Sequence, residues 1–194
     1  MSDDGTAGIY VHVPFCLTRC GYCDFNAYAG LDHLAPRYVR ALLAEAGLAA
    51  PAWSEDEVVS IFFGGGTPTT LDVADLKGVL THVRDRFVVR EDAEVSIEAN
   101  PDTVDVAKLE GLLSAGFDRL SMGAQSFDRV VLESLERLHS PDSVRRAFVA
   151  ARAAGYQNVN LDLIYGADGE AWTRGSGRSR RRSTCRRSTS ARTR

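Results

Sequence analysis

The main body of the chain alternates short apolar runs with longer stretches in which apolar residues recur at helical spacing. The apolar runs have the length of buried strands, and they cover residues 9–13, 58–63, 94–99, 119–122 and 159–164. Between them, positions such as Leu76, Val79, Leu80 and Val83 repeat with the period of an amphipathic helix. This spacing predicts helices over residues 35–48, 73–87, 104–115, 127–138 and 141–154.

Strands that alternate with helices of this size favour βα units and a parallel sheet. Right-handed crossovers then curve such a sheet toward a barrel or a doubly wound form. The chain has 194 residues, which is enough for one globular domain with a substantial core. No helical stretch follows the fifth strand, so the pattern stops in the middle of a βα unit. We therefore expect an α/β domain over residues 1–170 that is truncated after about five strands.

The composition changes abruptly after Glu170. Residues 172–194 contain nine Arg, no Lys and no acidic residue, and they have almost nothing to bury. A natural disordered basic tail is one interpretation of residues 171–194, and a shifted reading frame or a truncation is the one that we favour. Without those nine Arg, residues 1–171 carry 14 basic and 26 acidic side chains, a net charge of −12. An acidic body does not favour nucleic acid as a partner.

The sequence shows no signal for a membrane or for export. No apolar stretch reaches the roughly 18 residues that a membrane-spanning helix needs, so we expect no transmembrane segment. Residues 1–7 are polar and acidic, without the basic and apolar regions of a signal peptide. We therefore expect a cytoplasmic protein. Three of its four Cys lie within eight residues, which in that compartment indicates a metal or cluster site more than disulfides.

Cys16, Cys20 and Cys23 have the spacing C-x3-C-x2-C and directly follow the first strand. Soft thiolates suit iron–sulfur clusters, copper(I) and zinc. Three thiolates on one short loop can bind three corners of a cubane, which leaves the fourth iron open to a ligand. A structural zinc site is the alternative, although such sites need four ligands and often use two C-x2-C pairs. The sequence has no second pair, so His12 or His33 would have to complete that site.

Further candidate residues follow the second and third strands, at their carboxyl ends, where α/β folds bind ligands. Gly64-Gly65-Gly66-Thr67-Pro68 comes directly after the second strand. Glycines let the backbone approach a ligand closely and leave its amides free to pair with it. A simple turn is the alternative for this run. Glu98 lies near the end of the third strand, where it could accept from a ribose hydroxyl or act only as a polar group at a helix entry.

Three more polar residues lie near the last strands. Gln125 follows the fourth strand and could hydrogen-bond a ligand. Arg137 could pair with a carboxylate, or it could be a solvated cation at a helix end. Asp162 lies inside the apolar fifth strand, where an unpaired charge is costly, so we expect a functional role or a buried pair with an Arg. None of the four His stands out as a heme ligand.

At this point the chain resembles a known superfamily. The C-x3-C-x2-C loop after a first strand, with Tyr22 before the third Cys, is similar to that of the radical S-adenosylmethionine enzymes. Within them, the ordered motifs over about residues 8–168 resemble the oxygen-independent coproporphyrinogen III oxidase-like family. These motifs are Tyr10-Val-His-Val-Pro-Phe-Cys16, Tyr22-Cys-Asp-Phe-Asn26, Gly64-Gly-Gly-Thr-Pro-Thr69, Ile97-Glu-Ala-Asn-Pro101, Leu120-Ser-Met-Gly-Ala-Gln-Ser-Phe127 and Asn160-Leu-Asp-Leu-Ile-Tyr-Gly166.

The resemblance implies a fold, two cofactors and a set of contacts. The fold is a partial TIM-like (β/α)6 barrel, here truncated, and a C-terminal domain follows the barrel in the family. The cofactors are a [4Fe-4S] cluster on Cys16, Cys20 and Cys23 and S-adenosylmethionine on the open iron, which one electron cleaves to a 5′-deoxyadenosyl radical. The positions that contact S-adenosylmethionine in the family correspond to Tyr10, Tyr22, Gly65, Gly66, Thr67, Glu98, Gln125, Arg137 and Asp162.

One position distinguishes two branches of this family. The Cys pattern of the oxidase branch is C-x3-C-x2-C-x-C, whereas in this chain Phe25 occupies the position of the fourth Cys. In this chain only a few residues come before the first strand, whereas the oxidase has a longer N-terminal extension there. Both features favour the heme chaperone branch, for which the resemblance implies heme as a ligand, acceptor proteins for the heme and an electron donor. The oxidase and a non-enzymatic zinc-binding module remain the alternatives, and an enzymatic activity stays open.

Overall fold

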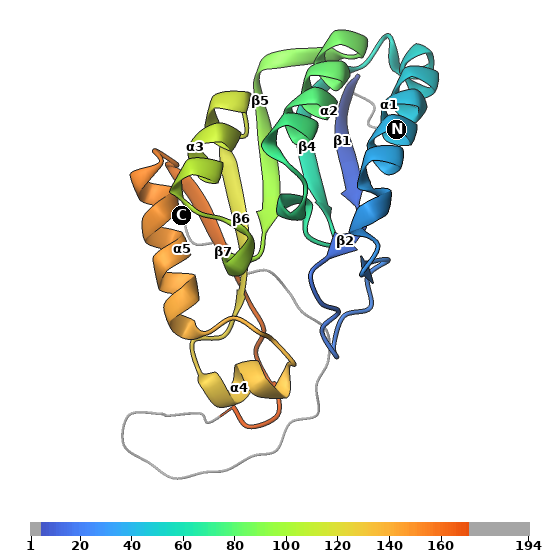
Figure 1. The fold of residues 1–194 in the computed structure, drawn as a ribbon. Helices are drawn as coiled ribbons and strands as arrows, with labels where there is room; N and C mark the ends of the chain where they lie inside the picture. The colour runs from blue at the N-terminus through green and yellow to red at the C-terminus, as the bar shows by residue number, and fades with distance from the viewer. Residues whose placement is uncertain (1–4, 171–194) are drawn as a thin grey trace.

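The computed structural model describes residues 5–170, and its centre is a parallel sheet. Figure 1 shows five strands side by side in the order β1-β4-β5-β6-β7, from the blue edge to the orange edge. All four neighbouring pairs run parallel. The strands are β1 (Thr6–Val13), β4 (Glu57–Gly65), β5 (Val88–Ala99), β6 (Arg119–Gln125) and β7 (Asn158–Leu163). This arrangement confirms the expected α/β class with a parallel sheet of five strands.

Helices connect the strands, and all of them except the short α4 lie along one side of the sheet, whereas α4 lies below the lower end of the sheet (Figure 1). Neighbours in sequence are also neighbours in this layer, because α1 packs on α2, α2 on α3, and α3 on α5. The helices are α1 (Ala35–Ala49), α2 (Val73–Arg86), α3 (Val106–Ala115), α4 (Arg129–Ser134) and α5 (Pro141–Ala153). No helix within residues 5–170 is long and apolar enough to cross a membrane.

Shorter elements shape the loops at the carboxyl ends of the strands. β2 (Phe15–Cys16) and β3 (Tyr28–Ala29) pair in parallel and bracket the loop that carries the Cys residues. Short 3-10 turns link other elements. Three of them lead into the next helix, namely η1 (Asp32–Leu34), η3 (Pro68–Thr70) and η4 (Pro101–Thr103), whereas η2 (Ala50–Trp53) leads from α1 into β4.

The helix ends follow from local chemistry. Asp105 caps α3 by accepting a hydrogen bond from the Lys108 amide at 2.8 Å. The same helix ends at Gly116, whose φ of 103° is a left-handed conformation that glycine adopts without strain. Ser140 and Ser143 form a reciprocal capping box at the start of α5. These caps explain why the predicted helices 104–115 and 141–154 agree with the structure to within two residues.

Alternate strand residues point to the helices and form the core. On this helix-covered face, Phe63, Ile97 and Leu120 are completely buried. They pack against apolar residues of the helices, such as Leu76 and Leu112. The residues between them point to the opposite face, which we term the open face. It carries the side chains of Ser60, Phe62, Glu94, Ser96, Glu98, Arg119, Ser121, Asn160 and Asp162, which line a single cavity.

One predicted helix was wrong in length. The spacing predicted a helix over residues 127–138, but α4 covers only Arg129–Ser134. The chain leaves the helical path because Glu136 adopts a left-handed φ of 54°. Residues 135–139 therefore form a turn that presents Arg137 and His139 instead of continuing the helix. The expected tail of residues 171–194 lies outside the described residues.

Candidate functional site

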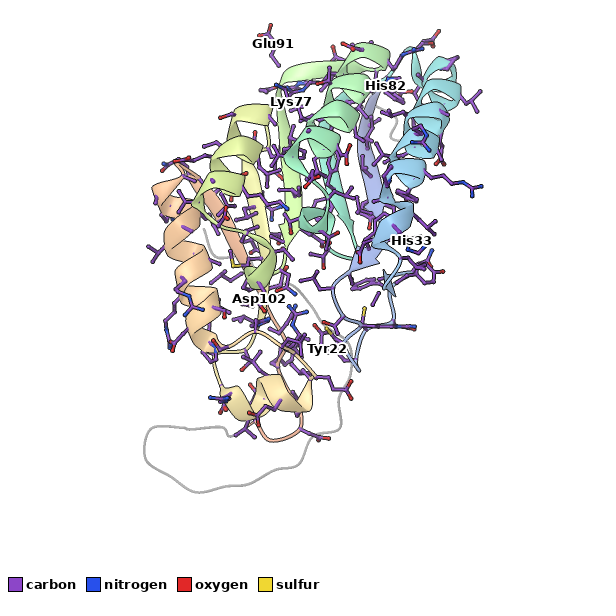
Figure 2. The ribbon with its side chains drawn as sticks, in the orientation of Figure 1. Tyr22, His33, Lys77, His82, Glu91 and Asp102 are labelled. Carbon is purple, nitrogen blue, oxygen red and sulfur yellow. The ribbon has the colours of Figure 1, made fainter. Side chains whose placement is uncertain are left out.

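The candidate residues gather at the carboxyl ends of the strands. A cavity of about 570 Å³ opens there. It lies between the loop of residues 16–23 that carries the three thiols (the Cys loop), the turn of residues 64–68 (the glycine turn) and the open face of the sheet. In Figure 2, Tyr22 lies at this lower end, whereas Glu91 stands at the opposite end of the sheet. Eleven of the twelve predicted site residues line the cavity: Cys16, Cys20, Tyr22, Cys23, Gly65, Gly66, Thr67, Glu98, Gln125, Arg137 and Asp162.

Tyr10 is the predicted residue that does not line this cavity. Its ring stacks on Phe62, with the ring centroids 6.0 Å apart, and Phe62 does line the cavity. Its hydroxyl hydrogen-bonds His12 Nδ1 at 3.2 Å, and His12 Nε2 contacts the carbonyl oxygen of Asn26 at 2.9 Å. Tyr10 therefore lies beside the site and is linked through His12 to the Cys loop.

The three thiols of the Cys loop are free and half-buried. Cys16 Sγ lies 3.6 Å from the hydroxyl of Thr67, and Arg137 Nη1 donates to Cys20 Sγ at 3.3 Å. Burial raises the pKa of the Cys16 thiol, while the hydrogen bond from Thr67 acts in the opposite direction. The amide of Cys23 donates to the carbonyl oxygen of Cys20 at 3.0 Å, which closes a tight turn between those two thiols.

The donor set of the Cys loop bears on which metal group it could hold. Among residues 5–170, no three His, Cys, Asp or Glu side chains form a group that could hold a single metal ion. The three thiols line one cavity, and three thiolates on one loop leave one iron of a [4Fe-4S] cluster open. A structural zinc site needs a fourth ligand. His12, a possible fourth zinc ligand, already uses both ring nitrogens.

The glycine turn packs tightly against the start of the Cys loop. A Cβ on Gly65, which has a φ of 113°, would lie 2.5 Å from the His12 ring. A Cβ on Gly66 would lie 2.6 Å from the carbonyl oxygen of Phe15. Only glycine fits this approach, because any other residue would collide with its neighbours.

The expectation that the amides of this turn are free was wrong. The Gly66 amide donates to Val13 at 2.8 Å, and the Thr67 amide donates to Phe15 at 2.7 Å. The Gly65 amide donates to Glu98 Oε2 at 3.1 Å. These hydrogen bonds thus fix the turn to the segment that leads into the Cys loop, and one of them also holds the carboxylate of Glu98. Its carbonyl oxygens, which accept rather than donate, are the groups that it can offer to a ligand.

Two carboxylates of the open face, Glu98 on β5 and Asp162 on β7, lie on either side of β6 and form the acidic part of the site. Burial raises the pKa of Glu98 to about 7, and the charge of Asp162 adds to this effect, against the hydrogen bond from Gly65. Asp162 accepts from Ser121 Oγ at 3.1 Å and from Asn160 Nδ2 at 2.7 Å. Within residues 5–170 the partners of Asp162 are thus two neutral donors, and no Arg of that range is paired with it. Both carboxylates can accept from ligand hydroxyls.

Arg137 also lines the cavity and is held in place by several hydrogen bonds. Its guanidinium donates to the carbonyl oxygen of Gly123 at 2.9 Å as well as to Cys20. The alternative of a solvated cation at a helix end was therefore wrong. Burial raises the pKa of the neighbouring Tyr22 to about 12, although the positive charge of Arg137 works against this rise. Gln125 closes β6 with a φ of 62°, a strained conformation that turns the chain at the cavity edge.

Sequence reasoning missed several residues that support the site. Asn160 and Ser121 hold Asp162, and Asn160 could have been found because residues i and i+2 of a strand share a face. His139 is 3% exposed and contacts both Arg137 and the backbone of β6. Its position two residues after Arg137 was visible in the sequence, but its burial was not.

Fold and site together define a class: a parallel α/β sheet that carries a three-Cys loop and a polar cavity at the carboxyl ends of its strands. The sequence matches the Radical SAM superfamily over residues 10–173, and the chain belongs to this superfamily. Membership implies a [4Fe-4S] cluster and S-adenosylmethionine as cofactors.

Comparison with individual proteins narrows the relationship. The chain is 48% identical over 167 residues to the heme chaperone HemW of Mycobacterium tuberculosis, an alignment that covers 84% of this chain and 43% of HemW. It is 36% identical over 159 residues to the oxygen-independent coproporphyrinogen III oxidase of Salmonella typhimurium, covering 81% of this chain and 35% of the oxidase. The chain thus spans less than half the length of either relative.

A solved structure supports the same relationship. The coproporphyrinogen III oxidase HemN of Escherichia coli, described as a radical SAM enzyme, superposes with a TM-score of 0.76 at 35% identity. The superposition covers 82% of this chain and 37% of HemN. The described fold is therefore similar to the corresponding part of HemN, and it is truncated relative to the full barrel.

Proposed function

We propose that the chain is the cofactor-binding part of a heme chaperone that holds a [4Fe-4S] cluster on Cys16, Cys20 and Cys23. In this role it would bind heme, deliver it to acceptor proteins and receive electrons from a separate donor. The observation that carries the proposal is the 48% identity to HemW, against 36% to the oxidase. Phe25 also stands at the position where the oxidase pattern has a fourth Cys. Phe25 is 66% exposed, so packing in the core does not explain why a Phe occupies this position.

The cavity offers groups that are complementary to S-adenosylmethionine. A cluster bound on the three thiols would supply single electrons to this cofactor. Arg137 is the cation suited to the methionine carboxylate. The carbonyl oxygens of the glycine turn suit the amino group, because an amino group donates and the amides of that turn are already engaged. Glu98 and Asp162, which also line the cavity, suit the ribose hydroxyls.

The ionisation of Glu98 adjusts this last contact. With a pKa of about 7, the carboxyl group is protonated in roughly half of the molecules at neutral pH. An ionised carboxylate accepts a hydroxyl hydrogen bond more strongly than a neutral acid does. We therefore expect the affinity for S-adenosylmethionine to rise between pH 6 and pH 8. Glu98→Gln should remove most of this rise.

The cluster is tested by anaerobic reconstitution of the full chain. We expect about four iron and four sulfide per chain and a broad visible absorption. Cys20→Ala should abolish the cluster, because two thiolates cannot hold a cubane securely. Cys185→Ala is the matched control, since it removes the one Cys outside the loop and should leave the iron content unchanged. One zinc per chain without sulfide would instead select the zinc-binding module.

The chaperone and the oxidase share the cluster, so other measurements must separate them. Titration with heme should give saturable binding, and incubation with coproporphyrinogen III should give no decarboxylated product. Product formation would move the assignment to the oxidase, the second candidate, which the structural similarity to HemN supports. Because the chain spans 43% of HemW, the same titration on a full-length relative is the control for heme contacts outside this chain.

A further inference from the structure

Arg137 reaches the site through a buried chain of hydrogen bonds. Its Nη1 donates to Cys20 Sγ at 3.3 Å, and its Nε donates to His139 Nδ1 at 3.3 Å. On the far side of the ring, His139 Nε2 contacts the carbonyl oxygen of Ala124 at 2.9 Å. Ala124 belongs to β6, so the chain of bonds connects a thiol of the Cys loop to the central sheet.

The two partners of His139 define its tautomer. The guanidinium of Arg137 can only donate, so His139 Nδ1 must accept and cannot carry a proton. The carbonyl oxygen of Ala124 can only accept, so Nε2 must carry the proton. Burial lowers the pKa of His139, which favours this neutral form. Both ring nitrogens are thereby used, and the ring has no freedom to serve a different ligand.

The backbone around these residues is also fixed. Glu136 takes a left-handed φ of 54°, and the amide of Arg137 donates to the carbonyl oxygen of Leu132 at 2.9 Å. Immediately after His139, Ser140 caps α5. Left-handed conformations of residues other than glycine persist where the surrounding structure enforces them, often at functional sites. The turn that interrupts the predicted helix therefore delivers one side chain, that of Arg137, to the Cys loop.

We propose that His139 is a positioning residue, whose neutral ring holds the Arg137 guanidinium against Cys20 and the S-adenosylmethionine side of the cavity. Without the acceptor at Nδ1, the long Arg side chain regains rotamers that leave the site. The hydrogen bond to Cys20 Sγ would then weaken, and hydrogen bonds to cluster sulfurs help set the reduction potential. This inference rests on the proposed cluster site, and it is independent of heme binding.

Two amide variants separate the two sides of the ring. In Asn, the amide oxygen lies as many bonds from Cβ as His Nδ1 does, so His139→Asn keeps an acceptor for Arg137. In Gln, the amide nitrogen corresponds in the same way to His Nε2, so His139→Gln keeps the donor to Ala124 and loses that acceptor. His139→Leu loses both, and its comparison with the two amide variants shows which side matters.

The experiment measures the dissociation constant of S-adenosylmethionine and the midpoint potential of the reconstituted cluster in each variant. We expect His139→Gln and His139→Leu to weaken binding by about tenfold to a hundredfold, as is typical for residues that orient a metal-site ligand. Their midpoint potentials should fall, because a cationic donor to a thiolate is lost. His139→Asn should remain close to the wild type in both measurements.

His82→Asn is the matched control for loss of an imidazole. His82 has a buried ring nitrogen without a hydrogen bond and lies on α2, away from Tyr22 (Figure 2). Equal effects of His139→Asn and His139→Leu, or unchanged binding in His139→Gln, would overturn the inference while the cluster site stands. A wild-type chain that takes up no cluster would overturn the site and the inference together. Failure to bind heme would affect neither.

Discussion

The helix-covered face and the open face of the sheet are built by the same strands, but the first forms the core and the second lines the cavity. Ile97 is completely buried under the helices, whereas its neighbour Glu98 points into the cavity. The helix-covered face is apolar and packed, and it carries most of the burial that stabilises the fold. Strand alternation thus places stability and chemistry one residue apart, so that neighbouring substitutions should have unlike consequences.

The open face is polar and internally paired. Ser96 donates to Glu94 at 2.9 Å, and Arg119 donates to Ser96 at 3.1 Å. A second network joins Ser121 and Asn160 to Asp162 near the carboxyl ends. These bonds satisfy groups that would otherwise be costly on a partly buried surface. They leave the face rigid and polar, as a binding surface for a polar cofactor needs to be.

The largest expected difference between the faces concerns two adjacent aromatic residues. Phe63 is completely buried, with its ring centroid 4.9 Å from that of Phe117, so Phe63→Ala should cost about 3–5 kcal/mol of unfolding free energy. Phe62→Ala, on the open face, should cost clearly less. Urea denaturation monitored by circular dichroism measures both. Equal losses would show that the open face contributes to stability as the helix-covered face does.

The pH dependence of stability should come from the open face. Glu98 binds its proton more tightly in the folded chain, with a pKa of about 7 against an ordinary value of 4.5. The folded state then holds more protons than the unfolded state between these values, so stability falls as the pH rises from about 4.5 to about 7. The expected loss is on the order of 3 kcal/mol.

Denaturation of Glu98→Gln across this pH range measures the effect, because that variant should lose most of the slope. Glu94→Gln is the matched control on the same strand and face, since the side chain of Glu94 is 48% exposed. The assignment fails if the two variants retain the same slope.

The glycine turn should be sensitive in a way that a helical glycine is not. Gly65→Ala introduces a Cβ 2.5 Å from His12 at a φ of 113°, and it should cost about 1–3 kcal/mol and weaken S-adenosylmethionine binding. Gly78→Ala, in α2, meets nothing within 4 Å and should stabilise the chain by about 0.5–1 kcal/mol. Thermal unfolding compares the two, and a shift of the same sign in both would refute this distinction.

The smallest expected effect tests the coupling of the two carboxylates. Asp162 raises the pKa of Glu98 through its charge, after the larger effect of burial. Asp162→Asn should therefore lower the pKa of Glu98 and move the pH transition of stability toward lower pH, without abolishing it. Ser121→Ala, which removes neutral hydrogen bonds to Asp162 and Asn160 but no charge, is the control. An unmoved transition in Asp162→Asn would mean that the charge of Asp162 does not contribute to the raised pKa of Glu98.

Much of the fold was predictable because its signals are local. The five predicted strands and the five predicted helices are all present, since strand alternation and helix periodicity reflect the same one-sided burial. The helix predicted over residues 127–138 was too long because the apolar spacing continues to Leu138. That spacing carries no information on the backbone of Glu136, which the tertiary structure holds in a left-handed turn.

The candidate site was predictable in its members more than in its contacts. Eleven of twelve predicted residues line the cavity, because the carboxyl ends of parallel strands lie at one edge of the sheet. Apart from Asn160, their partners were not predictable. The glycine amides bind the chain before the Cys loop, and Asp162 is held by Ser121, which lies 41 residues away in sequence.

By itself, the sequence determined which side of each strand is apolar, where the three thiols stand and which family the motifs resemble. Each of these depends on residue type and short spacing, which folding does not change. Only the tertiary structure decided that Arg137 contacts Cys20 across 117 residues, that His139 is buried behind it and that burial raises the pKa of Glu98 to about 7. These features depend on which distant segments pack together and exclude water, and that arrangement exists only in the folded chain.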